Sequence, residues 1–214
     1  MRIIAGRWRG RRLRVPRLAP VRPTPDRVRE TLFNWLAPEL PGRRCLDLFA
    51  GTGALGLEAL SRDAGFTLLV ERHGAAAAAL RRTLRELGLG PERARALQAD
   101  ALALLRRGPE TWGGPFAVVF LDPPFAAGLH GPCLHLLRER GWLAPGALVY
   151  VEAPAREPLP GPEGWSAHRE GRSGEVRFAL LRPPPGAPLS ARAPRPPAHP
   201  SPGRAAGPGL DWRR

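Results

Sequence analysis

Between residues 44 and 153, short apolar runs alternate with segments in which apolar residues recur every three or four positions. The apolar runs predict strands at 44–50, 67–71, 94–100, 116–122 and 147–153. The periodic segments predict helices at 54–61, 75–88, 101–107 and 128–142. Because parallel neighbours need a crossover between them, this alternation predicts an α/β fold with a mostly parallel sheet and helices on both faces.

The pattern changes on either side of this region. Residues 165–182 read as two strands around the turn 171–174, which predicts an antiparallel hairpin at one edge of the sheet. A further helix is predicted to begin near Pro25, before the first strand. We therefore expect a basic N-terminal hairpin or arm at 1–22, one α/β domain at 23–182 and a tail at 183–214. The tail has ten prolines in 32 positions and is predicted to be disordered.

The net charge of +14 is concentrated toward the ends of the chain. Residues 1–30 contain ten arginines and two acidic residues, whereas residues 31–182 contain 18 arginines and 16 acidic residues. All 33 basic residues are arginine, which is also typical of compositional drift in a GC-rich genome. Drift explains the choice of arginine over lysine but not its concentration in the arm. The arm therefore favours contact with a polyanion such as a nucleic acid.

The distribution of apolar residues along the chain favours a soluble protein. No apolar run reaches the roughly 18 residues of a membrane span, and the N-terminus lacks the apolar segment of a signal peptide. We therefore expect a cytoplasmic protein with no membrane association. The two cysteines, Cys45 and Cys133, have no metal-binding spacing, so no metal site is expected.

A glycine-rich turn between the first strand and the next helix predicts a cofactor site. Gly51, Gly53 and Gly56 satisfy the spacing G-x-G-x-x-G, and Glu71 ends the next strand 20 residues after Gly51. This fingerprint indicates an adenosine-containing ligand and by itself fits NAD as well as S-adenosyl-L-methionine. The other predicted cofactor-binding residues are Asp47, Phe49, Thr52, Arg72, Asp100 and Ala101.

Two carboxylates favour S-adenosyl-L-methionine over NAD. Asp47 lies four residues before Gly51, where it would repel a pyrophosphate but attract the ammonium group of a methionine moiety. Asp100 ends the third strand and can accept a hydrogen bond from the adenine amino group. The alternative for Asp100 is a helix N-cap, and one side chain can serve both purposes.

The fourth strand ends in the motif DPPF, Asp122 to Phe125. Prolines cannot donate to a sheet ladder, so the strand must stop there, at the edge where α/β sheets bind ligands. The Asp122 carboxylate and the Pro123 carbonyl can accept the two N–H groups of an exocyclic base amine, with Pro124 fixing the backbone and Phe125 offering a stacking face. These four residues are the predicted catalytic set. The alternative is a motif that only ends a strand and caps a helix.

These segments together resemble the bacterial small-subunit rRNA guanine-N2 methyltransferases of the RsmD type. The similarity covers nearly all of residues 2–182 and includes RIIAGRWRGRRL, DRVRETLFNWL, CLDLFAGTGALGLEALSR, DPPF and LVYVE. It implies a Rossmann-like, seven-stranded sheet and methylation of one guanine N2 of 16S rRNA, in the 30S subunit or an assembly intermediate, by a monomer. It also implies RNA contact by Arg7, Arg9, Arg11, Arg22, Arg27 and Arg29.

One departure from the family pattern concerns the adenine side of the cofactor. The resemblance implies an acidic or amide residue two positions after Glu71, where this chain has His73. Three other functions stay open on the sequence alone. They are methylation of adenine N6 in DNA or another RNA, rRNA binding by a non-catalytic assembly factor, and NAD-dependent oxidoreduction. Tyr150, the only tyrosine, is expected in the core or in the wall of the site.

Overall fold

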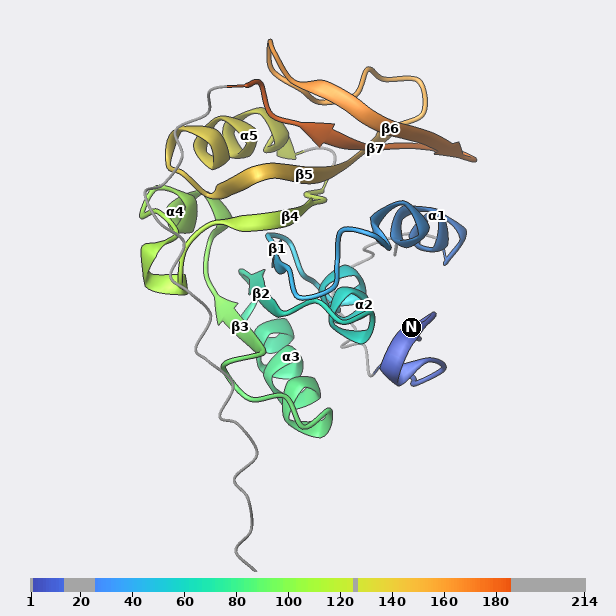
Figure 1. Ribbon diagram of the computed structural model, residues 1–214, viewed down its shortest axis with the longest axis vertical. Coiled ribbons are helices and arrows are strands. Elements are labelled where there is room, and N and C mark those ends of the chain that lie inside the picture. Colours follow the sequence, from blue (N-terminus) through green and yellow to red (C-terminus); the bar gives the residue numbers. More distant parts are fainter. Residues whose placement is uncertain (1, 14–25, 125–126, 186–214) are drawn as a thin grey trace, which may run out of the picture.

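The computed structural model describes residues 2–13, 26–124 and 127–185 and shows a seven-stranded sheet (Figure 1). The strand order is β3-β2-β1-β4-β5-β7-β6. Strands β1 to β5 pair in parallel, whereas β7 is antiparallel to both β5 and β6. This arrangement confirms the predicted Rossmann-like α/β sheet with an antiparallel hairpin at one edge. The strands are β1 (Arg44–Asp47), β2 (Phe66–Glu71), β3 (Ala94–Gln98), β4 (Phe116–Leu121), β5 (Leu143–Pro154), β6 (Ser166–Ser173) and β7 (Val176–Arg182).

Helices cover both faces of the sheet, as the alternation of patterns predicts. Helices α1 (Asp26–Leu36), α2 (Ala54–Ser61) and α3 (Gly74–Glu86) pack on one face. Helices α4 (Ala101–Leu105) and α5 (His130–Glu139) pack on the other, and Figure 1 shows the two groups on opposite sides of the strands. Two short 3-10 helices, η1 (Gly6–Trp8) and η2 (Glu110–Trp112), complete the described elements.

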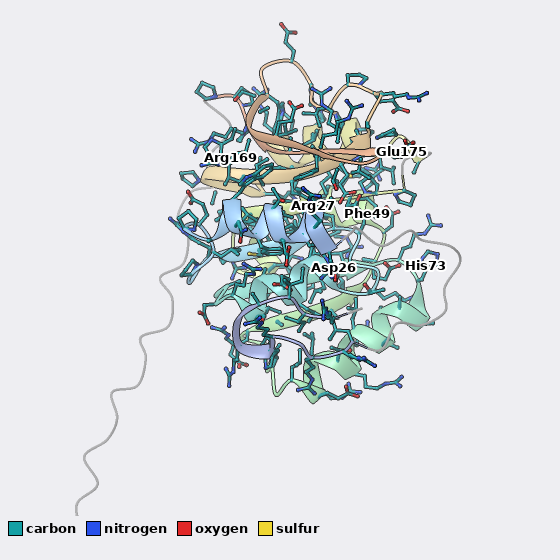
Figure 2. All side chains as sticks on the ribbon, turned by 90° about the vertical axis from the view of Figure 1, so that its right-hand side faces the viewer. Asp26, Arg27, Phe49, His73, Arg169 and Glu175 are labelled. Atoms are coloured by element: carbon teal, nitrogen blue, oxygen red, sulfur yellow. The ribbon has the colours of Figure 1, made fainter. Side chains whose placement is uncertain are left out.

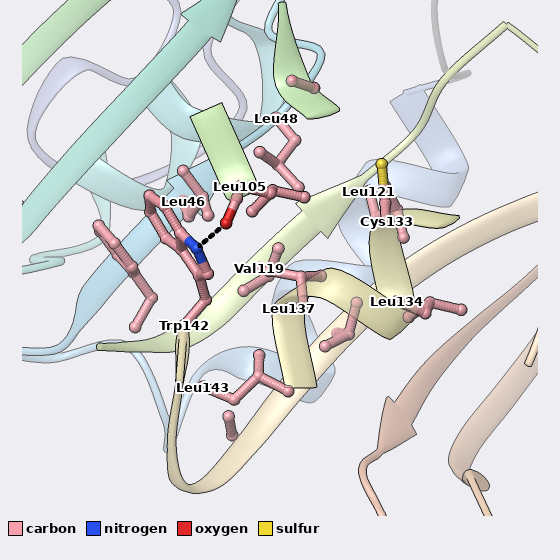
Figure 3. Packing of buried hydrophobic residues seen from close by; sticks show 14 of the residues in the cluster. Leu46, Leu48, Leu105, Val119, Leu121, Cys133, Leu134, Leu137, Trp142 and Leu143 are labelled. Atoms are coloured by element: carbon pink, nitrogen blue, oxygen red, sulfur yellow. Dashed lines mark hydrogen bonds between the residues drawn. The ribbon is translucent and has the colours of Figure 1, made fainter. Parts of the chain in front are cut away.

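Each face of the sheet has its own apolar core. On the side of α4 and α5, leucine and valine side chains from β1, β2, β4, β5 and β7 form one cluster with Trp142, whose indole Nε1 donates a 2.9 Å hydrogen bond to the carbonyl of Leu105 (Figure 3). On the side of α1, the ring of Phe120 is tilted against that of Phe33 and makes a T-shaped contact with that of Tyr150. Because both faces are covered, the central strands are buried along their length and only their ends can carry chemistry.

The strand order brings the two sequence motifs together. Strand β4 lies beside β1, with Asp47 opposite Phe120, and the Leu48 N–H donates to the Phe120 carbonyl at 3.1 Å. Strands β2 and β3 are added on one side of β1, whereas β4 and β5 are added on the other side. The carboxyl ends of β1 and β4 therefore form the switch point at which such sheets bind ligands. The glycine turn follows β1 and the DPPF motif follows β4, so both lie at this edge.

The described part of the N-terminal segment is a small hairpin attached to the domain. Arg2 and Arg12 form an antiparallel bridge, and η1 lies between them. Ile3 and Leu13 are buried in the same apolar cluster as residues of α2 and α3. Residues 14–22 of the predicted arm and 186–214 of the predicted tail lie outside the described residues.

Candidate active site

The glycine turn adopts backbone angles and contacts that require glycine. Gly51 and Gly53 have φ angles of 51° and 80°, in the left-handed region. A Cβ atom on Gly53 would lie 2.7 Å from a Leu80 methyl group, so α3 packs against the bare backbone of the turn. A Cβ atom on Gly56 would lie 2.8 Å from a Leu69 methyl group of β2, which is the close approach of helix and sheet that the motif predicts. The turn therefore leads tightly from β1 into α2.

Asp47 lies buried beneath this turn, on the α2 side of the sheet. Its Oδ2 accepts the Gly56 N–H at 3.0 Å, and only 3% of the residue is exposed. Burial raises the pKa of Asp47 from 3.8 to about 7, and the negative charge of Glu71 adds to this increase. A buried carboxylate that is costly to ionise gains most from a cation, so Asp47 suits an ammonium group rather than a pyrophosphate.

Glu71 connects the end of β2 to the glycine turn. Its Oε2 accepts the Gly51 N–H at 2.9 Å, and its Oε1 accepts the backbone N–H of His73 at 2.7 Å. The ring Nδ1 of His73 lies 2.8 Å from the same Oε1, and more than half of that side chain is exposed. The carboxylate is therefore held at the strand end, beside the glycine turn, and its contact with a ribose stays a prediction. His73, the residue that departs from the family pattern, orients Glu71 in this structure.

The remaining predicted cofactor residues surround the same edge. Asp100 is the N-cap of α4, because its Oδ1 accepts the Ala103 N–H at 2.8 Å. The capping alternative is thus present, and contact with adenine stays a prediction. Figure 2 shows Phe49 and His73 on one side of the molecule, beyond the carboxyl ends of the strands. Among the other candidates, Thr52 and Phe49 are half-buried, Arg72 is exposed and Ala101 is buried.

The DPPF motif leaves the sheet at the end of β4. Asp122 is half-buried, Pro123 is buried and Pro124 is exposed, while Phe125 lies outside the described residues. The Asp122 carboxylate is close enough to Tyr150 for its charge to contribute to raising the pKa of that phenol. Tyr150 belongs to the apolar cluster on the α1 side of the sheet. Asp122 therefore lies on the same face as Asp47, one strand away.

Comparison with known proteins identifies the family. A family model described as "Conserved hypothetical protein 95" matches residues 1–182. The Ribosomal RNA small subunit methyltransferase D of Escherichia coli strain K12 is 48% identical over 183 residues, which cover 85% of this chain and 89% of that relative. The protein of the same name from Haemophilus influenzae is 44% identical over 182 residues, covering 85% and 93%. The chain belongs to the RsmD family.

A solved structure of an RsmD-family relative supports this assignment. The protein described as "Putative methyltransferase yhhF from Escherichia coli" superposes with a TM-score of 0.76 and 45% identity, covering 86% of this chain and 98% of the other. The resemblance inferred from the sequence motifs is thereby confirmed. The similarity includes the N-terminal hairpin, because the family model begins at residue 1.

The predicted RNA-binding arginines of this RsmD-family chain have different surroundings. Arg7, Arg9 and Arg11 are exposed on the hairpin, and Arg27 is exposed at the start of α1 (Figure 2). Arg22 lies outside the described residues. Arg29 is only 1% exposed.

The structure corrects the role expected for Arg29. Its Nη2 lies 2.6 Å from the Asp26 carboxylate, and both Nη atoms donate to the carbonyl of Arg2. The Arg29 guanidinium therefore joins the hairpin to α1, and because it is buried it is not exposed for contact with RNA.

Sequence reasoning missed two residues that attach the hairpin to α2. Glu58 is fully buried and accepts the N–H groups of Ile4 at 2.7 Å and Ala5 at 3.0 Å, while its Oε1 also pairs with Arg62 at 2.9 Å. The Ser61 hydroxyl accepts the Trp8 N–H at 3.0 Å and donates to the Ala5 carbonyl at 2.6 Å. A signal for Glu58 was present in the sequence, because it is the one charged residue in the mostly apolar stretch ALGLEALS.

The structure also bears on metals and membranes. Within residues 2–13, 26–124 and 127–185, no group of three or more His, Cys, Asp or Glu side chains is arranged to hold a metal ion. Over the same ranges, no helix has both the length and the apolar character needed to cross a membrane.

Proposed function

We propose that the protein transfers a methyl group from S-adenosyl-L-methionine to the exocyclic N2 of one guanine in 16S rRNA. The observation that carries the proposal is the position of Asp122 and Pro123 beside the glycine turn, at the carboxyl ends of β4 and β1. The relatives named Ribosomal RNA small subunit methyltransferase D, at 44% and 48% identity, support the substrate class.

The cofactor is held by residues of the first two strands and their turns. Asp47 accepts the ammonium of the methionine moiety, and Glu71 accepts the ribose hydroxyls. Gly51 and Gly53 allow the backbone to approach the ligand closely. Phe49, Thr52, Arg72, Asp100 and Ala101 line the adenosine side of the site. When bound, S-adenosyl-L-methionine supplies an electrophilic methyl group on a positively charged sulfur.

The residues at the end of β4 prepare the amine. The lone pair of an exocyclic amine is delocalised into the base, so the nitrogen is a poor nucleophile. The Asp122 carboxylate and the Pro123 carbonyl each accept one N–H, which favours a pyramidal nitrogen and directs its lone pair toward the methyl group. As the nitrogen bonds the methyl group and the sulfur–methyl bond breaks, positive charge moves to the nitrogen and these two oxygens stabilise it. The methylated amine then releases one of its two protons, for which the Asp122 carboxylate is the adjacent acceptor. Pro124 restricts the backbone that aims the carbonyl, and Phe125 stacks on the flipped base.

The exposed arginines of the hairpin and of α1 bind the RNA backbone. Arg7, Arg9, Arg11 and Arg27 neutralise phosphates, and Trp8, which is partly exposed beside them, adds an apolar contact. In this proposal the enzyme acts as a cytoplasmic monomer on the 30S subunit or an assembly intermediate, residues 1–22 bind RNA, and residues 23–182 carry the chemistry.

The deciding experiment is methyl transfer to purified 30S subunits with labelled S-adenosyl-L-methionine, followed by identification of the modified nucleoside. We expect label in N2-methylguanosine at one position of 16S rRNA. The Asp122→Asn variant should lose at least about 100-fold in kcat with little change in cofactor affinity, since a group that acts only on the developing charge is removed. Label in N6-methyladenosine, or transfer to duplex DNA instead of 30S subunits, would contradict the proposal.

A further inference from the structure

Strand β5 contains two buried polar side chains that the proposed mechanism does not use. Tyr150 and Glu152 are two residues apart and therefore project from the same face of the strand. The Tyr150 hydroxyl donates to the Glu152 Oε1 at 2.6 Å. Tyr150 is 0% exposed and Glu152 is 4% exposed, and Glu152 is one of four buried acidic residues in the part of the chain that the structure describes.

Satisfying a tyrosine hydroxyl does not require a buried negative charge. A neutral acceptor would pair with the hydroxyl without the cost of removing a carboxylate from water, which is several kcal/mol in a protein interior. Burial, followed by the charge of Glu152, raises the pKa of Tyr150 well above its usual value, so the tyrosine stays a hydrogen-bond donor to the carboxylate. Buried charges of this kind are concentrated at functional sites.

The strand register places Glu152 beside the catalytic motif. Leu121 of β4 lies opposite Val151 of β5, so Asp122 and Glu152 each follow directly at the same level of the sheet. Neighbouring strands are about 4.8 Å apart. Because side chains alternate along a strand, Asp122 projects on the same face as Phe120, and Glu152 on the same face as Tyr150, which is the α1 side of the sheet. In keeping with this placement, the charges of Glu152 and Asp122 both help to raise the pKa of Tyr150.

We infer that Glu152 is the residue that distinguishes guanine from other bases, by accepting the N1–H of the target base while Asp122 and Pro123 accept its N2 amine. This inference rests on the proposed function. On the Watson–Crick edge of guanine, N1–H is the donor next to the N2 amine, so acceptors on two neighbouring strands can bind both. A base whose N1 carries a lone pair instead would be repelled by the carboxylate. Tyr150 fixes the carboxylate in place from the opposite side.

The experiment compares guanine with 2-aminopurine at the modified position. 2-Aminopurine keeps the N2 amine but has a lone pair at N1 and no oxygen at C6. The 16S rRNA carrying either base is assembled into 30S particles, and kcat/KM for labelled methyl transfer is measured. For the wild type we expect guanine to be preferred at least about 100-fold, because a site built for a donor rejects an analogue that lacks it.

Variants separate base recognition from folding. Glu152→Gln should reduce the preference for guanine at least about 10-fold, since its amide can donate to N1 of 2-aminopurine. Cofactor affinity should be unchanged. Glu175→Gln removes the same charge from an exposed residue at the same edge of the sheet and should keep the wild-type preference (Figure 2). Tyr150→Phe tests the support of Glu152 and should lower the preference while the fold is retained.

The outcomes distinguish the inference from the proposed function. If the wild type does not methylate guanine N2 in 30S particles, the proposed function fails. If it does so but methylates 2-aminopurine with similar kcat/KM, the inference alone is overturned, and this result needs no variant. An unchanged preference in a folded Glu152→Gln protein would also overturn it.

Discussion

Replacing Glu58 by glutamine should weaken the attachment of the N-terminal hairpin without unfolding the domain. The Glu58 carboxylate is fully buried in α2 and accepts two backbone N–H groups of the hairpin, from Ile4 and Ala5. A glutamine of the same shape keeps one carbonyl oxygen but presents an NH2 group where the second acceptor was. One backbone donor therefore loses its partner, and the pairing with Arg62 loses its charge.

The expected cost follows from these interactions. A buried donor left without a partner costs about 1–3 kcal/mol, and the loss of charge weakens the remaining hydrogen bonds. We therefore expect the hairpin to be less firmly attached by roughly 2–4 kcal/mol, which raises its opening equilibrium about 30-fold to 1,000-fold. The central strands do not contact Glu58 through hydrogen bonds, so their stability should change much less.

Native-state hydrogen exchange of peptides spanning residues 2–13 and 116–121 measures the two effects separately. Faster exchange should be confined to the hairpin peptide. Glu30→Gln, the same change at an exposed position of α1, is the control and should alter neither peptide. Unchanged protection of residues 2–13 in a folded Glu58→Gln protein would refute the view that Glu58 holds the hairpin.

Four further predictions concern cofactor affinity, pH-dependent stability, the glycine turn and RNA binding. Because the pKa of Asp47 is raised from 3.8 to about 7, cofactor affinity should rise between about pH 5.5 and 7.5 as the carboxylate ionises, and calorimetry on Asp47→Asn should show weaker, pH-independent binding. The same shift means that the free protein loses stability, on the order of 4 kcal/mol from this group, as the pH rises from about 4 to 7. Gly56→Ala should cost roughly 1–3 kcal/mol in chemical denaturation, since its Cβ would meet Leu69 at 2.8 Å. Replacing Arg7, Arg9 and Arg11 by glutamine should lower RNA affinity and reduce its log–log salt slope by about 0.7–0.9 for each phosphate that is no longer neutralised.

The predictions for cofactor affinity, the glycine turn and RNA binding each have a control or a contradicting result. Affinity that falls as the pH rises over the same range would show that the neutral form of Asp47 binds the cofactor. Gly131→Ala, in α5, is the matched change for Gly56→Ala because nothing lies within 4 Å of its Cβ position, and it should be neutral or slightly stabilising. If the arginine variants lose cofactor and RNA affinity equally, the hairpin and the sheet do not divide these tasks.

The features that were predicted correctly from the sequence are local ones. These features are the alternation of strand and helix, the glycine turn and the end of the strand at Pro123. Each depends on residues close together in the chain, so a short segment of sequence is enough to predict it. Asp100 shows the same locality, because an N-cap needs only the three residues that follow it. The position of the glycine turn next to DPPF also followed, since the carboxyl ends of parallel strands share one edge.

The features that were missed depend on tertiary structure. Arg29 was expected to face RNA, but its guanidinium meets the carbonyl of Arg2, 27 residues earlier, and becomes buried. Glu58 meets the hairpin 53 and 54 residues away. Glu152 is a single acidic residue in an apolar strand, and only the register of β5 with β4 places it beside Asp122. No short window of sequence contains such pairings.

The hairpin and the glycine turn are attached to the same short helix. Gly53 and Gly56 lie at the start of α2, whereas Glu58 in its middle and Ser61 at its last residue hold the hairpin. The eight helical residues span about 12 Å along the helix axis, and the backbone hydrogen bonds of the helix keep this length fixed. Under the proposed function, the separation between the hairpin arginines and the methyl donor is therefore constant. An RNA bound to the hairpin would then have to adjust its own conformation, by extruding the target nucleotide, for its amine to reach the strand ends.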